Sequence, residues 1–244
     1  MDKIDLDKVA KTYNELDIIW NDDDKWHLVT KRMISGFIEN SLKAIPNHDT
    51  FKILNAGSAG YSYGIKEDNI FHVDIAEKRI SHLPNSVVAN VEELPLPSQL
   101  FDMVICVGSV LNYCDPFKVT SEFSRVLKNQ AFIILEFESS YTFELLFKKG
   151  FNNSAVFVET FLNAEKEKLW YFSETYIKRL LSSYNFEVVS KKRCHILSPM
   201  VYRIIKNDKR ASWFSKLDRI CSYIPGIDKF CSNAIYLFKR KENF

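Results

Sequence analysis

The sequence predicts an α/β fold built on a doubly wound, mostly parallel sheet of about seven strands. Short apolar runs alternate with helical patterns from residue 52 onward, which is typical of a parallel sheet with helices on both faces. A glycine-rich turn follows the first run, and three of the chain's seven glycines lie between Gly57 and Gly64. Asp74 closes the next run. A strand, a glycine turn and an acidic strand end are together how an open α/β sheet holds a nucleoside.

Two amphipathic helices are expected before the glycine turn, at residues 5–20 and 24–45. Apolar side chains recur at helical spacing in the second one, and the preceding Asn-Asp-Asp-Asp supplies cap oxygens and negative charge. Only about ten residues separate Gly60 from the next strand, so the intervening helix must be very short or irregular. Strands are then expected at 52–56, 70–75, 86–90, 102–108 and 131–137, with helices at 77–83 and 116–128.

The alternation weakens after residue 138. Residues 141–150 look helical, residues 152–172 are ambiguous, and residues 173–184 form a helix with Ser173 as its cap. Two closing strands are expected at 186–197 and 233–241 as an antiparallel pair at one edge of the sheet, so the last strand is antiparallel.

We expect one domain over residues 1–244. Its parts are an N-terminal helical cap (1–48), a ligand-binding core (51–140) and a C-terminal half (141–244) with a helical insert at 199–231.

Composition limits the class of protein. With 46% hydrophobic and 26% charged residues the chain is globular, and a net charge of +2 is too small to indicate a nucleic-acid partner. Five cysteines without a C-x-x-C pair argue against a disulfide framework and a structural zinc site, so we expect no metal and a reducing, cytoplasmic location. No apolar run approaches the roughly 18 residues of a membrane span, and no signal sequence is expected at the N-terminus.

Five motifs occur in an order that resembles the class I S-adenosylmethionine-dependent methyltransferases of the small-molecule type, close to the type 11 and type 25 methyltransferase domains. They lie at about residues 52–138 and read ILNAGSAG, HVDI, VVANVEELPLP, FDMVICVGSVLNY and EFSRVLKNQAFIILEFE. One glycine motif alone would be weak, whereas five in order are specific. The resemblance implies a Rossmann-like fold, S-adenosyl-L-methionine as cofactor, and methyl transfer to an O, N, C or S nucleophile on a small, hydrophobic or aromatic acceptor.

The resemblance also assigns the cofactor contacts. The glycine turn would approach the amino-acid half of the cofactor, Asp74 would accept both ribose hydroxyls, and residues 90–92 would pass the adenine. The implied cofactor-binding residues are Asn55, Ala56, Gly57, Ser58, Gly60, Asp74, Ile75, Asn90, Val91, Glu92, Val107, Gly108 and Ser109. Two positions depart from the family pattern: Asn55 replaces the usual Asp and Ala59 the usual Gly. We expect Asn55 to orient backbone groups without a charge, and Ala59 to adopt an ordinary backbone conformation.

The sequence says less about the residues that bind the methyl acceptor than about those that bind the cofactor. The residues expected to form the acceptor site or its lid are Tyr13, Trp26, His27, Asn112 and Tyr113, and Trp26 and His27 are expected to approach the bound ligand. Methyl transfer is an in-line displacement for which alignment and a dry pocket suffice, so a general base is optional. Should the acceptor need deprotonation, the candidates are His27, Tyr113, Glu138 and His195, which the sequence does not rank.

Two other functions stay open at this level. A nicotinamide oxidoreductase would share the glycine turn and the acidic strand end, but would usually show a fuller G-x-G-x-x-G and a longer helix after it. A non-catalytic protein that binds S-adenosylmethionine as a scaffold is also consistent with Asn55 and Ala59. The oligomeric state cannot be derived from the sequence.

Overall fold

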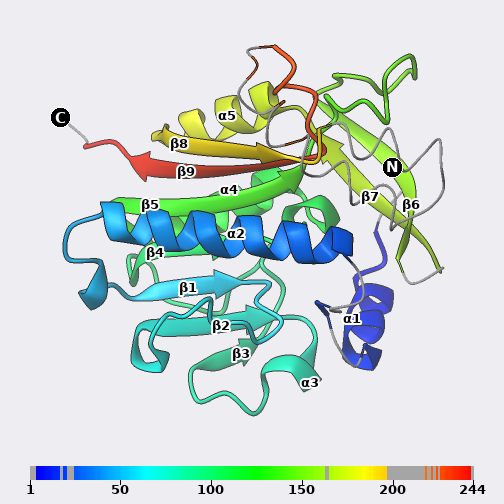
Figure 1. Cartoon of the computed structure of the whole chain (residues 1–244). Helices are drawn as coiled ribbons and strands as arrows, with labels where there is room; N and C mark the ends of the chain where they lie inside the picture. Colours follow the sequence, from blue (N-terminus) through cyan, green and yellow to red (C-terminus); the bar gives the residue numbers. More distant parts are fainter. Residues whose placement is uncertain are drawn as a thin grey trace.

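The computed structural model describes residues 4–16, 19–20, 25–162, 165–196, 218, 221, 224 and 226–242. Its main feature is a seven-stranded sheet in the order β3-β2-β1-β4-β5-β9-β8 (Figure 1). The strands are β1 (Ile53–Ala56), β2 (Ile70–Asp74), β3 (Ser86–Val88), β4 (Phe101–Cys106), β5 (Leu127–Glu138), β8 (Phe186–Cys194) and β9 (Asn233–Arg240). Neighbours from β3 to β5 are parallel, and β9 is antiparallel to both β5 and β8. The predicted fold, including its antiparallel last strand, is confirmed.

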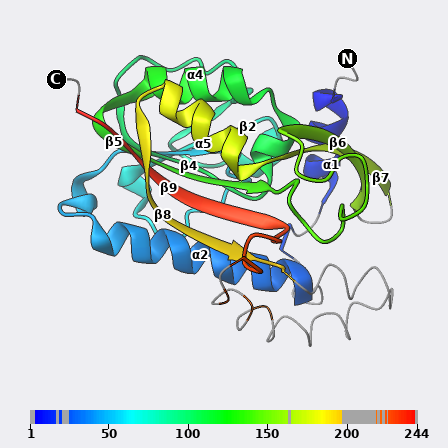
Figure 2. The ribbon, with the colours of Figure 1, turned by 90° about the horizontal axis from the view of Figure 1, so that it is seen from above.

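Helices cover both faces of this sheet (Figure 2). Helix α2 packs on one face through Ile34 and Ile38, while α4 and α5 pack on the other through residues such as Phe123 and Leu181. The helices are α1 (Leu6–Glu15), α2 (Lys25–Ala44), α3 (Glu77–Ile80), α4 (Pro116–Val126) and α5 (Glu174–Ser183), with short 3₁₀ turns η1 (His48–Thr50), η2 (Glu67–Asn69) and η3 (Val110–Tyr113). None of the helices in the described ranges has the length and hydropathy of a membrane span.

The connection between β1 and β2 is irregular, as predicted. Its described helical element is the 3₁₀ turn η2, and Tyr61, Tyr63 and Ile65 pack beside it against the face that α2 covers. Helix α2 precedes β1 in the chain, and it buries Ile34 and Ile38 against β1 and β4 residues such as Ile53 and Met103. An N-terminal helix therefore supplies much of the apolar cover that a crossover helix normally provides.

The helix predicted at residues 141–150 is wrong, because this segment forms consecutive turns. Its apolar residues do not make a helical stripe: Leu145 and Phe151 pack with the hairpin that follows. Phe147 has a left-handed φ of 66°, which interrupts any helix at this point. The ambiguous segment after it is an antiparallel hairpin of β6 (Ala155–Leu162) and β7 (Glu165–Phe172).

Two predicted helical segments are only partly covered by the described residues. The first N-terminal helix ends at Glu15, earlier than the predicted residue 20. Most of the predicted insert at 199–231 lies outside the described residues, and its described end at 226–230 forms turns.

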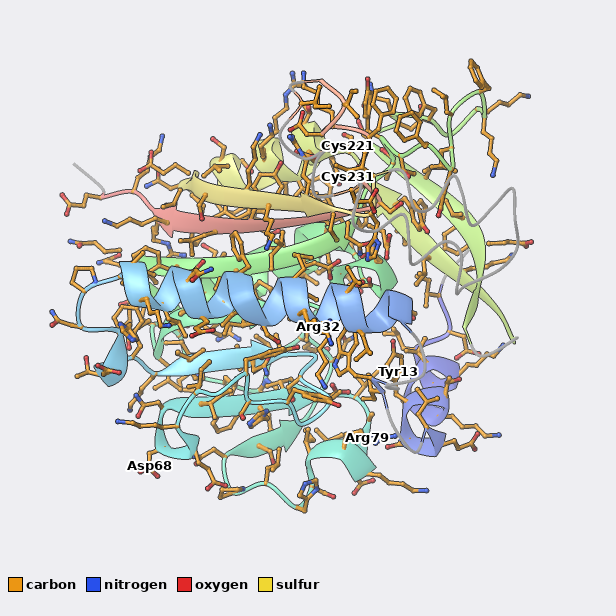
Figure 3. All side chains as sticks on the ribbon, in the orientation of Figure 1. Tyr13, Arg32, Asp68, Arg79, Cys221 and Cys231 are labelled. Atoms are coloured by element: carbon orange, nitrogen blue, oxygen red, sulfur yellow. The ribbon has the colours of Figure 1, made fainter. Side chains whose placement is uncertain are left out.

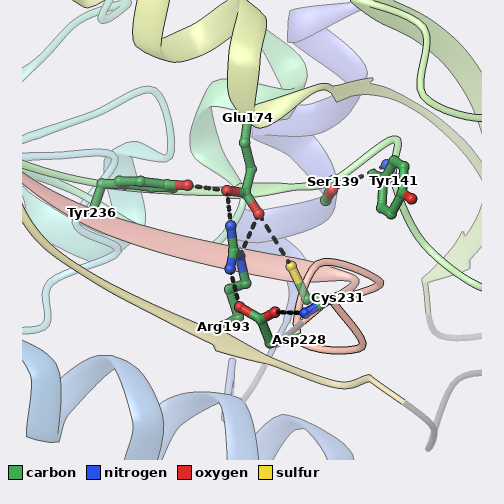
Figure 4. Close-up of polar contacts among 8 residues, drawn as sticks. Ser139, Tyr141, Glu174, Arg193, Asp228, Cys231 and Tyr236 are labelled. Carbon is green, nitrogen blue, oxygen red and sulfur yellow. Dashed lines mark hydrogen bonds and ion pairs between the residues drawn. The ribbon is translucent and has the colours of Figure 1, made fainter. Parts of the chain in front are cut away.

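A buried ion-pair network holds α5, β8 and β9 together at the edge of the sheet (Figure 4). The Arg193 guanidinium donates two hydrogen bonds of 2.6 Å to the Glu174 carboxylate and a further one to Asp228. Tyr236 donates its hydroxyl to Glu174. Burial raises the pKa of the Glu174 carboxyl, but the hydrogen bonds from Arg193 and Tyr236 outweigh it and hold the pKa below its usual value. The buried charges of this network keep their hydrogen-bond partners only while all of its residues are present.

Replacing Arg193 with methionine should lower the free energy of unfolding by about 3–5 kcal/mol, because it leaves the Glu174 charge buried without a partner. Urea unfolding at neutral pH measures this loss. The loss should shrink as the pH falls, because Glu174 has a lowered folded pKa and its contribution is present only above the unfolded value of 4.5. The control is Lys168→Met, since Lys168 forms an exposed pair with Glu159 and should cost at most about 1 kcal/mol. Equal losses in the two variants would contradict the prediction.

Candidate cofactor and acceptor site

The glycine turn after β1 is fixed by two close approaches. Gly57 and Gly60 have φ values of 71° and 82°, in the left-handed region that glycine adopts without strain. A Cβ atom on Gly57 would lie 2.3 Å from the side chain of Val110, in the segment after β4. A Cβ on Gly60 would lie 2.7 Å from the carbonyl oxygen of Arg79 in α3. Only glycine lets this turn meet both neighbours at the carboxyl edge of the sheet.

Asp74 joins the end of β2 to that turn. Its Oδ2 accepts a hydrogen bond from the Ala59 amide at 2.7 Å, and its Oδ1 accepts one from the Ala76 amide at 2.8 Å. Burial raises the pKa of the Asp74 carboxyl, and these amide donors oppose the rise. With the Ile75 amide, three amides contact the carboxylate, and they occupy only part of its accepting capacity of about four lone pairs. The carboxylate is therefore oriented by the turn and can still accept from hydroxyl groups.

The two departures from the family pattern have different outcomes. The expected ordinary backbone at Ala59 is wrong: its φ is 46°, because its amide must point at the Asp74 carboxylate. Asn55 is buried, and its side-chain amide donates to the Tyr61 carbonyl at 2.6 Å. It orients a backbone group, as predicted, by a hydrogen bond that an ionised aspartate could not donate.

The segment after β4 runs beside the glycine turn and contacts two carboxylates of β5. Gly108 and Ser109 have positive φ values of 79° and 61°. The Ser109 amide donates to Glu136 at 2.7 Å, and its hydroxyl donates to Glu138 at 3.2 Å. Val107 just before them is buried. The glutamates therefore hold this segment in its left-handed conformation.

Glu136 and Glu138 form a carboxylate pair on one face of β5. The side-chain amide of Asn233, on β9, donates to Glu136 at 2.7 Å and to Glu138 at 3.0 Å. Burial raises the pKa of both carboxyls, and the charge of Glu136 raises that of Glu138 further. Sequence reasoning found Glu138 but missed Glu136 and Asn233. The available signal was the pattern Glu-Phe-Glu at the end of a buried strand.

Two of the predicted lid residues, Tyr13 and Tyr113, contact each other. The hydroxyls of Tyr13 in α1 and Tyr113 in η3 lie 3.4 Å apart, and their rings pack edge to face. Figure 3 shows Tyr13 beside Arg79, whose Nε donates to the Tyr13 carbonyl at 2.8 Å. The amide of Lys78 donates to the side chain of Asn14 at 2.9 Å. Helix α1 is thus attached to α3 by polar contacts.

Asn112, whose contact with an acceptor stays a prediction, makes hydrogen bonds to two neighbouring strands. Its Oδ1 accepts from the amide of Glu138 at 3.0 Å, and its Nδ2 donates to the carbonyl of Trp170 in β7. The side chain is fully buried. It binds the hairpin to the end of β5, so the described geometry makes it a positioning residue for the roof of the site.

The remaining predicted residues are His195, Trp26 and His27. His195 follows β8 directly and is buried, and its Nε2 forms a 2.7 Å hydrogen bond with Thr30 of α2, so the ring is held by the fold. Trp26 and His27 lie in the first turn of α2, but their side chains are outside the described residues, so their approach to a ligand stays a prediction.

The predicted adenine segment is shaped by its own polar contacts. Asn90 accepts from the amide of Glu92 at 2.9 Å, which forms a tight turn. The Glu92 carboxylate accepts from the Asp115 amide at 2.8 Å and pairs with Lys118, at the start of α4. Ala56 and Val91 are buried, whereas Ile75 is half-buried. Among the described residues, no group of His, Cys, Asp and Glu is arranged to hold a metal ion.

Replacing Asn55 with aspartate should destabilise the protein, although aspartate is the residue that the family resemblance implies at this position. The carboxylate would face the Tyr61 carbonyl with no hydrogen to donate, which should cost about 1–3 kcal/mol in urea unfolding at neutral pH. Burial would raise the folded pKa of the new carboxyl, so the cost should grow as the pH rises and shrink under acid conditions. Parental stability of this variant across the pH range would rule out the assigned hydrogen bond.

Comparisons with known proteins agree with this geometry. Residues 56–135 match the family model described as a methyltransferase domain. An uncharacterised protein of Methanocaldococcus jannaschii is 31% identical over 99 residues, a match that covers 38% of this chain and 44% of that relative, less than half its length.

Solved structures show the fold. An S-adenosylmethionine dependent methyltransferase of Listeria monocytogenes superposes with a TM-score of 0.58 at 12% identity, over 87% of this chain and 99% of that one. The 1,6-didemethyltoxoflavin-N1-methyltransferase of Burkholderia thailandensis was crystallised with bound 1,6-didemethyltoxoflavin and S-adenosylhomocysteine. It superposes with a TM-score of 0.56 at 12% identity, over 97% of this chain and 87% of that one. Residues 56–135 thus match a methyltransferase domain, and the chain has the fold of these solved S-adenosylmethionine-dependent methyltransferases.

Proposed function

We propose that this protein transfers the methyl group of S-adenosylmethionine to a small, hydrophobic or aromatic acceptor. The observation that carries the proposal is the meeting of three separate motifs at one edge of the sheet. The glycine turn abuts Val110 after β4, and Asp74 bonds to the turn through Ala59. These are the positions that the resemblance assigns to the methionine half and the ribose of the cofactor.

The cofactor assignment rests on the chemistry of these groups. Backbone amides in a glycine turn and a carboxylate at the end of the next strand suit a ligand with an amino-acid end and a ribose. The bound S-adenosylhomocysteine of the Burkholderia enzyme supports the same assignment here. A nicotinamide cofactor is less favoured, since a 3₁₀ turn stands where dinucleotide-binding proteins place a longer helix.

The acceptor side is aromatic and roofed by the hairpin. Tyr113 packs against the cluster of Leu145, Leu169 and Tyr171, and Tyr13 meets it from α1. Aromatic walls with a few polar groups are typical of pockets for small ring-bearing ligands. The Burkholderia enzyme, which was crystallised with a small-molecule compound, supports this class of acceptor.

Glu138 is the proposed base. A lone pair of the acceptor attacks the methyl carbon, the carbon–sulfur bond breaks, and S-adenosylhomocysteine leaves as a neutral sulfide. The acceptor's proton then passes to the Glu138 carboxylate, which burial makes a stronger base by raising its pKa above the usual value. Ser109 and Asn233 hold this carboxylate in place, and Glu136 beside it is a positioning residue.

Asp74→Ala should weaken binding of both S-adenosylmethionine and S-adenosylhomocysteine by roughly 10- to 100-fold, because a charge-assisted pair of hydrogen bonds is lost. Isothermal titration calorimetry measures the effect. Some stability should be lost as well, since Ala59 and Ala76 lose their acceptor. The matched control is Asp68→Ala, an exposed aspartate in η2 that should bind both ligands normally. The same dissociation constant in the two variants would disprove the ribose assignment.

Glu138→Gln should lower turnover by roughly 100-fold or more while the affinity for the cofactor stays unchanged. A screen of acceptors with a labelled methyl donor supplies the substrate for this measurement. The parent's rate should rise with pH through a pKa above the usual carboxyl value of 4.5, because only the deprotonated form takes up a proton. This limb should be missing in the glutamine variant and retained in the control Glu187→Gln, at the far edge of the sheet. Parental turnover of Glu138→Gln would exclude this carboxylate as the base.

A further inference from the structure

The turn at residues 145–149 holds a phenylalanine in open solvent. Phe147 is 96% exposed, and its φ of 66° lies in a region that non-glycine residues rarely adopt. Lys148 and Lys149 follow it, and both are exposed. Exposing an aromatic ring to water costs free energy, and so does holding a non-glycine residue at a left-handed φ. The backbone strain persists where the surrounding structure enforces it. A surface that takes up the ring would offset the first cost.

A second turn, at residues 226–230, packs against the first segment through Phe230. The Phe230 ring stacks on Phe143 with centroids 4.4 Å apart and lies 4.6 Å from Tyr141. Figures 1 and 2 both place the two segments near each other, beside the β6–β7 hairpin. The exposed apolar and basic residues of the two segments, which we call the basic tip, are Phe147, Lys148, Lys149, Ile224, Ile227 and Lys229.

The first turn is anchored to the hairpin, so its shape is set by the fold. A Cβ on Gly150 would lie 2.5 Å from the side chain of Val156 in β6, which shows how closely the two backbones approach. The Ser140 hydroxyl donates to the Asn153 carbonyl at 2.6 Å and closes the base of the segment. Phe147 is therefore presented outward by a fixed support.

Charges in the two segments are divided between an inner and an outer side. The acids face inward: Asp228 binds Arg193, and Glu144 lies close enough to Tyr171 for its charge to raise the pKa of that hydroxyl. The lysines face outward, and none of the ion pairs found among the described residues involves Lys148, Lys149 or Lys229. The outer side of the basic tip is thus apolar and positively charged.

We propose that the basic tip docks the protein on an anionic lipid surface, with Phe147 in the headgroup region and the lysines against lipid phosphates. Apolar side chains among lysines are the combination that binds such surfaces. The exposed apolar area of three side chains is small beside the roughly 800 Å² per partner that a stable protein interface buries. A lipid surface needs no such area, because charge attraction supplies much of the binding. This inference does not depend on the proposed methyl transfer.

Vesicle flotation tests the proposal with the full chain. The protein should bind vesicles that mix phosphatidylcholine with anionic phosphatidylglycerol, should not bind phosphatidylcholine alone, and should be released by high salt. Absence of binding to the anionic vesicles at low salt would overturn the proposal.

Matched variants identify the surface. Lys148→Gln with Lys149→Gln should weaken vesicle binding by roughly 25-fold, about fivefold for each lysine, and Phe147→Ala should weaken it too. The control is Phe117→Ala with Lys118→Gln on α4, where a phenylalanine that is 55% exposed also precedes an exposed lysine. Phe147, Lys148 and Lys149 are exposed, so thermal unfolding of the tip variants should match the parent. Equal binding by tip and control variants would overturn the assignment, as would sedimentation showing that Phe147→Ala converts a dimer into a monomer.

Discussion

Buried carboxylates at the ends of strands are the constraint on which the functional edge of this protein depends. A carboxylate that leaves water must be hydrogen-bonded, and each one here takes at least one donor from a neighbouring loop. Asp74 takes amides from the glycine turn and from the start of α3, and Glu136 takes the Ser109 amide from the segment after β4. The loops that would contact a cofactor are therefore shaped by acids that belong to the sheet. Removing one of these acids changes the loop as well as the charge.

The strands of the sheet could be predicted from the sequence because parallel strands buried on both faces read as continuous apolar runs between turns. The segment at 141–150 could not, because its apolar spacing fits a helix equally well. The segment forms turns instead of a helix because Leu145 and Phe151 pack against the β6–β7 hairpin in a separate small hydrophobic cluster. That hairpin pairs two segments that the sequence had left ambiguous.

Site residues could be predicted where a sequence motif alone indicates their role. They could not be predicted where the role depends on a residue that is distant in the sequence. Asp74 and the glycines could be assigned from the order of motifs. The left-handed backbone at Ala59 could not, because it follows from a bond to Asp74 fifteen residues away. Asn233 lies 95 residues from Glu138, and only the register of β5 against β9 brings their side chains together. The bond between His195 and Thr30 of α2 could not be predicted either, because the two residues lie 165 positions apart in the sequence.

The attachment of α1 has a consequence for how a ligand would enter and leave. This helix buries one apolar side chain, Val9, and is otherwise held by contacts from Arg79, Lys78 and Tyr113. Burial of one valine contributes about 1.5–3 kcal/mol, far less than the sheet gains from its strands. The backbone amides of helix α1 should therefore exchange with solvent earlier than those of β1 or β4. The time that a ligand stays bound would then be set by the opening of this short helix.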